Sequence, residues 1–182
     1  MQGYQPGFYI IAGYPNAGKT ALMINFFLDA LSANEQLFCA FYSLDDTKEI
    51  IAYRMLAVLS NIEINRVKGF KYKSQYELES LENAYKTLEK YSTRIILKDL
   101  TEIDNIEALE AEIDELYTKS NGNLMVFIDG LHNLEIPFDI GSIREENIKR
   151  ANMIKKIIDL YNIPLFTTTE LRKPKVQMLI IP

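Results

Sequence analysis

The sequence has almost none of the residues that build disulfide frameworks or zinc sites. Its 182 residues include one cysteine, Cys39, and one histidine, His132. Cys39 lies inside an apolar run, which is typical of a small core residue. A single thiol forms no internal disulfide, and zinc sites need several Cys or His ligands. Both kinds of site are therefore excluded.

Long apolar runs and a surplus of basic residues are also missing. No stretch approaches the roughly 20 apolar residues that a membrane-spanning helix needs, and the N-terminus lacks the basic and apolar blocks of a signal peptide. We therefore expect a cytoplasmic protein without a membrane partner. The formal net charge of -5 argues against a free-standing nucleic-acid binder, which usually has a basic face, but it does not exclude a local DNA-binding loop.

The clearest functional signal lies within residues 8–32. An apolar run of β-forming residues, Phe8 to Ala12, precedes it, and apolar residues at helical spacing follow from Ala21. Between them lies a full match to the phosphate-binding pattern G-x-x-x-x-G-K-[ST]: Gly13-Tyr14-Pro15-Asn16-Ala17-Gly18-Lys19-Thr20. Since this motif requires a strand, a glycine turn and a helix in that order, the stretch indicates a nucleoside triphosphate site.

The chemistry of this loop follows from its backbone. Gly13 and Gly18 let the chain curl so that successive N–H groups face one anion, and the start of the following helix adds its positive end. We expect residues 13–21, Ala21 included, to bind ATP or ADP. Lys19 is expected to reach the β and γ phosphates and the Thr20 hydroxyl to bind Mg²⁺. The alternative, a glycine turn with an ordinary surface lysine, is disfavoured by the flanking pattern.

The rest of the chain alternates between predicted strands and helices. We expect further strands at 37–43, 94–97, 124–129 and 163–169, with helices from Thr47 and over 76–91, 104–119 and 143–162. This alternation predicts an α/β fold, with a mainly parallel sheet covered by helices on both faces. Residues 1–182 suit a single domain. The basic segment 65–74 is predicted to be a loop or helix junction, either a solvated face or a contact for DNA or phosphate.

Acidic residues follow three of the predicted strands. In an open parallel sheet the ligand binds beyond the carboxyl ends of the strands. Asp45 and Asp46 follow the second strand, Asp129 ends the fourth and Glu170 follows the fifth. Asp129 is expected to help Thr20 hold Mg²⁺, with a turn residue as the alternative. Asp45 suits polarising the attacking water, with a helix start as the alternative.

The order of these motifs resembles the C-terminal RecA-like ATPase domain of the DnaB family of replicative hexameric DNA helicases. The resemblance covers nearly the whole chain. Its more specific part is a Ser-Leu-acid segment with an arginine nine positions later, seen here in Tyr42-Ser43-Leu44-Asp45 and Arg54-Met55-Leu56-Ala57. It also includes Ile128-Asp129-Gly130-Leu131, and Asn162-Ile163-Pro164 leading to Thr169-Glu170-Leu171.

The resemblance implies a RecA-like P-loop NTPase that hydrolyses ATP with Mg²⁺. The family couples this hydrolysis to movement along single-stranded DNA, in a ring of six identical subunits with ATP at each interface. It implies that Lys19, Asp45 and Glu170 are catalytic and that Arg54 supports the nucleotide site by pairing with an acid, an ordinary surface arginine being the alternative. The family's last strands, its arginine finger and its N-terminal domain are expected to be missing from this chain.

Three residues depart from the family pattern. Asp45 stands where a catalytic Glu is usual and is one methylene shorter. Glu170 stands where a Gln senses the γ phosphate, so we expect Arg172, Lys173 or a proton to neutralise it. His132 stands where a Gln is common. The sequence therefore leaves two alternatives to a helicase: a RecA-family ATPase of the RadA or KaiC kind, and a nucleotide-binding scaffold that has lost hydrolysis.

Overall fold

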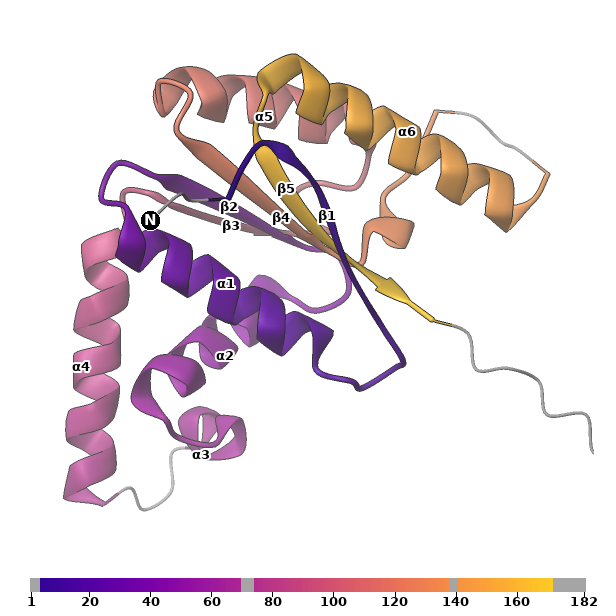
Figure 1. Cartoon of the computed structure of the whole chain (residues 1–182). Coiled ribbons are helices and arrows are strands. Elements are labelled where there is room, and N and C mark those ends of the chain that lie inside the picture. The colour runs from indigo at the N-terminus through magenta and orange to yellow at the C-terminus, as the bar shows by residue number, and fades with distance from the viewer. Residues whose placement is uncertain (1–3, 70–73, 138–140, 172–182) are drawn as a thin grey trace, which may run out of the picture.

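The computed structural model describes residues 4–69, 74–137 and 141–171 (Figure 1). Its strands form one parallel sheet in the order β1-β5-β4-β2-β3. The strands are β1 (Gly7–Gly13), β2 (Phe38–Ser43), β3 (Ile95–Asp99), β4 (Leu124–Asp129) and β5 (Pro164–Glu170). The helices are α1 (Lys19–Ala33), α2 (Lys48–Ser60), α3 (Ile64–Lys68), α4 (Gln75–Tyr91), α5 (Ile106–Lys119) and α6 (Ile143–Tyr161), with a 3₁₀ turn, η1 (Leu131–Asn133).

Helices cover both faces of the sheet, as the sequence predicts (Figure 1). Successive residues of a strand point to opposite faces, so neighbouring residues enter different cores. Phe41 and Phe127 pack with Phe27 of α1 on one face. Tyr42 and Ile128 pack on the other face, in the core that α5 and α6 close. Both faces of β4 are buried along its whole length, which explains its unbroken apolar sequence.

The strand register brings the functional ends of the strands together. Ser43, the last residue of β2, is level with Asp129 of β4, and Gly13 of β1 is level with Glu170 of β5. The backbone N–H of Leu44 donates to the carbonyl of Asp129 at 2.8 Å, so β2 and β4 stay paired up to the sheet edge. Four chain segments therefore leave the sheet side by side at one edge.

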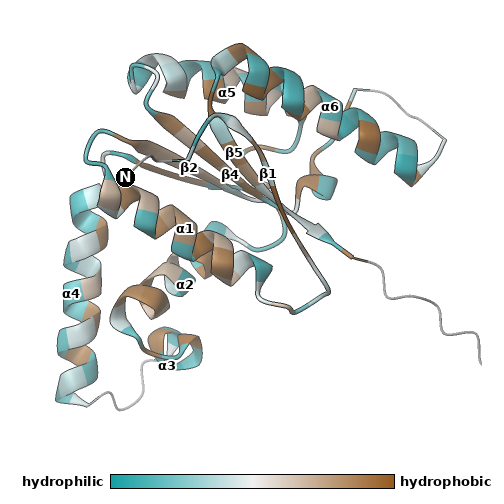
Figure 2. Cartoon of the chain, viewed as in Figure 1, coloured by the Kyte–Doolittle hydropathy of each residue, from teal (hydrophilic) through white to brown (hydrophobic). Residues whose placement is uncertain are grey.

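Helix α4 lies beyond the sheet and packs on α2 and α3 through a small third core of Leu56, Ile62, Val67, Leu81 and Ala84. Figure 2 shows its exposed side largely in hydrophilic colours. Residues 65–74 were expected to be a loop or helix junction. Residues 65–68 belong to α3, a helix of five residues, and Ser74 caps α4, so the described part of this segment lies at a helix junction. Such a helix is too short to produce a periodic apolar pattern. Residues 70–73 lie outside the described residues.

Two local details differ from expectation. Helix α2 starts after Thr47 as predicted, but the Thr47 side chain makes no capping hydrogen bond. The Asp99 carboxylate at the end of β3 accepts the Lys48 N–H instead, at 3.1 Å. The turn η1 directly after β4 was not predicted. Residues 138–140, and residues 172–182 with Arg172 and Lys173, lie outside the described part. None of the described helices combines the length and apolar character that a bilayer crossing demands.

Glu77 should make the stability of the α3–α4 region depend on pH. Its carboxylate accepts from Arg66 Nη2 at 2.6 Å and from the Ser74 N–H at 2.8 Å, and these bonds, the arginine first, lower its pKa from 4.5 to about 2. A pKa that is lower in the folded state stabilises the fold above the unfolded pKa and loses that contribution as pH falls toward the folded one. Glu77→Gln should therefore lower the free energy of unfolding at pH 7, and the gap to wild type should narrow below pH 4.5.

Urea unfolding followed between pH 7 and pH 3 measures this gap, with Glu89→Gln on the same helix as the matched control. If the difference in free energy of unfolding between Glu77→Gln and wild type stays constant over this pH range, the lowered pKa of Glu77 is contradicted.

Candidate functional site

The loop between β1 and α1 has the conformation that an anion site requires. Asn16 and Gly18 have left-handed backbone angles, with φ of 61° and 85°. A residue with a Cβ loses about 1–2 kcal/mol in this region, so Gly18 suits its position. Helix α1 begins directly afterwards, at Lys19, and no acidic residue occupies its first turn. The positive end of α1 therefore faces the loop without an anion of its own.

Lys19 lies across this loop. Its Nζ donates to the carbonyl of Tyr14 at 3.2 Å and lies 3.5 Å from Glu170 Oε1. The Lys19 side chain is 12% exposed and that of Glu170 is 55% exposed. Within the described residues, the cation beside Glu170 is thus the lysine of the phosphate loop. Arg172 and Lys173, to which the sequence pointed, lie outside the described residues, so that expectation stays a prediction.

Asp129 joins three elements through its two carboxylate oxygens. Thr20 Oγ1 donates to Oδ2 at 2.6 Å, and Thr168 Oγ1 donates to Oδ1 at 2.6 Å. The Thr168 hydroxyl also accepts the Gly130 N–H at 3.0 Å. Asp129 is 2% exposed, and these bonds offset the free energy that burying a carboxylate costs. A hydroxyl and a carboxylate oxygen at this spacing are ligands that Mg²⁺ accepts, so the donors fit the expected metal.

The two acids that follow β2 have different partners. Asp46 accepts a hydrogen bond from Arg54 Nη2 of α2 at 3.1 Å, so the arginine lies beside an acid of the site. Asp45 accepts from Asn133 Nδ2 of η1 at 2.5 Å, and His132 Nε2 lies 3.8 Å from the same oxygen. Burial raises the pKa of Asp45, and His132 lowers it less.

One cavity of about 390 Å³ brings most of the predicted residues together. Its charged groups are four acids and two basic residues, so the cavity carries excess negative charge until a cation enters. Of the predicted residues, Gly13, Tyr14, Pro15 and Ala17 do not line it. Its walls are formed by Asn16, Gly18, Lys19, Thr20, Ala21, Asp45, Asp46, Arg54, Asp129 and Glu170.

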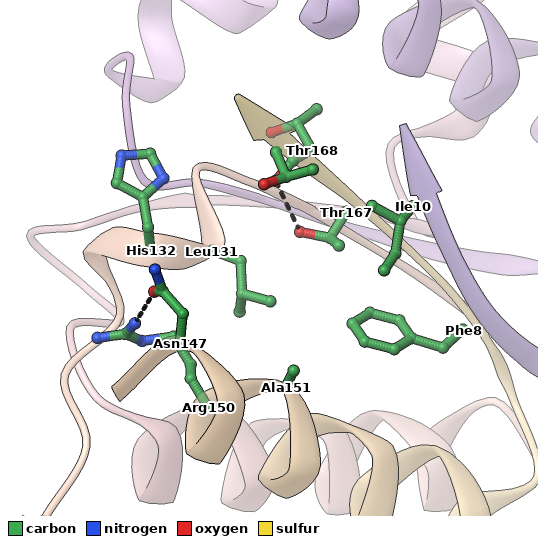
Figure 3. A pocket seen from close by; sticks show the side chains of 10 residues that line it. Phe8, Ile10, Leu131, His132, Asn147, Arg150, Ala151, Thr167 and Thr168 are labelled. Carbon is green, nitrogen blue, oxygen red and sulfur yellow. Dashed lines mark hydrogen bonds between the residues drawn. The ribbon is translucent and has the colours of Figure 1, made fainter. Parts of the chain in front are cut away.

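A second, smaller cavity of about 170 Å³ lies between the β1–β5 edge and α6 (Figure 3). Phe8 and Ile10 of β1 line it, and His132 lies at its η1 end. The buried Arg150 ties α6 to the segment after η1, because its Nε donates to the carbonyl of Leu134 at 2.6 Å. None of its lining residues lines the cavity beside the phosphate loop, so the two cavities are separate.

The sequence did not identify two residues of the site, Thr168 and Asn133. Thr168 lies in a run of three threonines inside a buried strand, a usable signal because a buried hydroxyl needs a partner. Asn133 gave no such signal. It meets Asp45 only through folding, across 88 positions of sequence.

The family model for the DnaB-like helicase C terminal domain matches residues 1–177. The chain belongs to this family. It is 30% identical over 165 residues to the replicative DNA helicase DnaB of Synechocystis sp., covering 90% of this chain and 18% of that protein. It is 25% identical over 174 residues to a protein of Trieres chinensis named "Probable replicative DNA helicase", covering 94% of this chain and 37% of that protein. The chain thus spans well under half the length of these relatives.

Solved structures agree on the fold. A DnaB-like replicative helicase, described with its interactions with primase, matches with a TM-score of 0.82 and 20% identity, covering 97% of this chain and 43% of that one. A solved ATPase domain matches with the same TM-score and identity, covering 93% and 59%. With the five-stranded parallel sheet, these matches confirm the predicted RecA-like α/β fold.

Thr168→Val should destabilise the fold by removing the hydroxyl that Asp129 and Gly130 share. Both groups are buried, and leaving buried polar groups without partners costs roughly 1–3 kcal/mol each. We expect the free energy of unfolding in urea to fall by roughly that amount for Thr168→Val and to stay near wild type for Thr168→Ser. Thr87→Val removes an exposed hydroxyl that bonds only within α4 and is the control. Equal stability of Thr168→Val and Thr87→Val would refute this role.

Proposed function

We propose that the chain is the ATP-binding and ATP-hydrolysing core of a DnaB-like replicative DNA helicase. The observation that carries the proposal is the contact of Thr20 with Asp129 directly beneath a complete phosphate loop. It occurs in a chain of the DnaB-like helicase C terminal domain family, whose helicases use nucleotide with Mg²⁺. The family match favours a helicase over an ATPase of the RadA or KaiC kind.

In the proposed MgATP complex, the phosphate loop would bind the phosphates, and Thr20 with the buried Asp129 would bind the metal. Backbone N–H groups from Gly13 to Ala21 would surround the phosphates, and Lys19 would bind the β and γ oxygens. Thr20 and Asp129 would hold Mg²⁺, which neutralises charge as the γ phosphate leaves. The Glu170 end of the Lys19–Glu170 pair is 55% exposed and the two atoms lie 3.5 Å apart, so the pair is weak and Lys19 can exchange Glu170 for phosphate oxygens at low cost.

Hydrolysis would depend on the acids around the loop, because phosphoryl transfer needs mainly positioning and electrostatic help. In our proposal Asp45 orients the attacking water and accepts its proton, and Glu170 responds to the γ phosphate. Arg54 contributes by holding Asp46 at the cavity wall. For the complete assembly, we propose a ring of six copies with ATP between neighbouring subunits. In this ring, ATP hydrolysis would be coupled to movement along single-stranded DNA.

A second candidate is a nucleotide-binding protein without hydrolysis. The shorter Asp45 favours it, because a misplacement of about 1 Å can lower a rate by about a hundredfold. Both candidates share the same phosphate loop. They differ in turnover and not in the binding of MgATP.

Lys19→Ala should abolish tight MgATP binding and leave the fold intact. Each charge-assisted hydrogen bond to phosphate contributes about 1.5–3 kcal/mol, so losing two predicts a drop in affinity of about a hundredfold or more. Isothermal titration with ATP and with ADP in Mg²⁺ measures the affinity, and circular dichroism checks the fold. Lys86→Ala, which removes an exposed lysine paired within α4, should bind as wild type does. An unchanged affinity in folded Lys19→Ala would remove the site assignment.

Single-stranded DNA should increase the rate of ATP hydrolysis if the helicase proposal holds. The measurement is phosphate release from wild type under saturating MgATP, with and without a single-stranded oligonucleotide, and Lys19→Ala gives the background. A rate above background that DNA raises severalfold supports the helicase. Tight MgATP binding with release at background under both conditions would support the non-hydrolysing candidate.

A further inference from the structure

Asn133, the last residue of η1, links the turn after β4 to the exit of β2. Its Nδ2 donates to the carbonyl of Leu44 at 3.0 Å and to Asp45 Oδ1 at 2.5 Å. An amide nitrogen has two hydrogens, so these acceptors use both. The direction of the amide is therefore fixed by a backbone atom, and the amide in turn fixes one oxygen of the Asp45 carboxylate.

Gly130 lets the backbone of this turn come close to the same carboxylate. Its φ is 82°, and a Cβ at this position would lie 2.6 Å from Asp45 Cγ. Such a distance is far below van der Waals contact, so a side chain at 130 would push the carboxylate away. The turn thus supplies both the space in which the Asp45 carboxylate lies and the amide that binds it.

The charges around Asp45 act on its carboxylate in opposing directions. Asp129 on β4 and the adjacent Asp46 repel it, whereas His132, 3.8 Å from Oδ1 on the η1 side, attracts it when protonated. The side chain of Asp45 is 46% exposed, so packing alone does not hold its χ angles. A hydrogen bond to a charged carboxylate is stronger than one between neutral groups, so the Asn133 amide can select one rotamer of Asp45 among these charges.

We propose that Asn133 is a positioning residue for hydrolysis: it holds Oδ1 of Asp45, so that Oδ2 faces the cavity and orients the attacking water. This role rests on the proposed function, in which Asp45 is the acid beside the γ phosphate. Together, Asn133 and Gly130 place a short acid where the family pattern has a longer one. Asn133 touches neither nucleotide nor water itself.

The decisive variant is Asn133→Leu, which keeps the size of the side chain and removes its amide. We expect kcat for ATP hydrolysis to fall by about tenfold to a hundredfold, because a small misplacement of a reacting group has that effect. The Kd for MgATP should stay within about twofold, since no phosphate ligand is lost. Asn133→Gln, which retains a donor, should keep more of the rate. Asn65→Leu on α3, whose amide bonds an exposed glutamate, is the matched control.

The same substitution made in the Asp45→Ala variant tests whether Asn133 acts through Asp45 or has a general structural role. In Asp45→Ala, Asn133 has no carboxylate to hold, so adding Asn133→Leu should not lower kcat further, whereas two independent effects would multiply. A wild-type kcat in Asn133→Leu, or an equal drop in both backgrounds, would overturn the inference while the proposed function stands. A wild-type chain that binds MgATP but shows no turnover, with or without DNA, would instead overturn the proposed hydrolysis and the role of Asn133 with it.

Discussion

The site depends on one buried carboxylate, that of Asp129. Two threonine hydroxyls take up its two oxygens, one from the start of α1 and one from β5. Burying a carboxylate without such partners would cost several kcal/mol. The hydrogen bonds of Asp129 therefore hold the start of α1 and the ends of β4 and β5 in fixed positions relative to one another. The phosphate loop begins where β1 ends, level with the end of β5, and its helix is tied to Asp129. The position of Thr20 and Asp129 relative to the loop follows from this arrangement.

The second constraint is charge. Four carboxylates and two cations line the cavity beside the phosphate loop, and each cation is paired with an acid, Lys19 with Glu170 and Arg54 with Asp46. Both pairs are partly exposed and therefore weak. Each cation offsets one of the four negative charges, and either pair can rearrange at low cost when Mg²⁺ and a triphosphate bind. The departure at Glu170 is therefore compatible with binding, because its charge has a partner within the loop itself.

Local pattern was sufficient for much of this structure. The bounds of β4 were predicted to the residue, because an apolar run with an acid at its end has few other interpretations. The phosphate loop was equally clear, since strand, glycines and helix are all local. Thr168, Asn133 and the Asp99 cap of α2 were not predicted, because each acts on a residue 39 to 88 positions away. Hydrogen bonds between residues so far apart in the sequence depend on the order of the strands in the sheet, and the periodicity of a single strand does not predict that order.

The contacts of Asp45 bear on whether a shorter acid means a lost activity. A glutamate at this position would carry its carboxylate about 1.5 Å further along the side chain, beyond the Asn133 amide that now binds it. Gly130 lies against the present position of this carboxylate, since a Cβ at 130 would lie 2.6 Å from Asp45 Cγ. Asp45 therefore fits its two neighbours: the Asn133 amide binds its carboxylate, and Gly130 leaves the space in which the carboxylate lies. A methylene missing at one residue is thus not enough to infer loss of hydrolysis, because the neighbouring turn determines where the carboxylate lies.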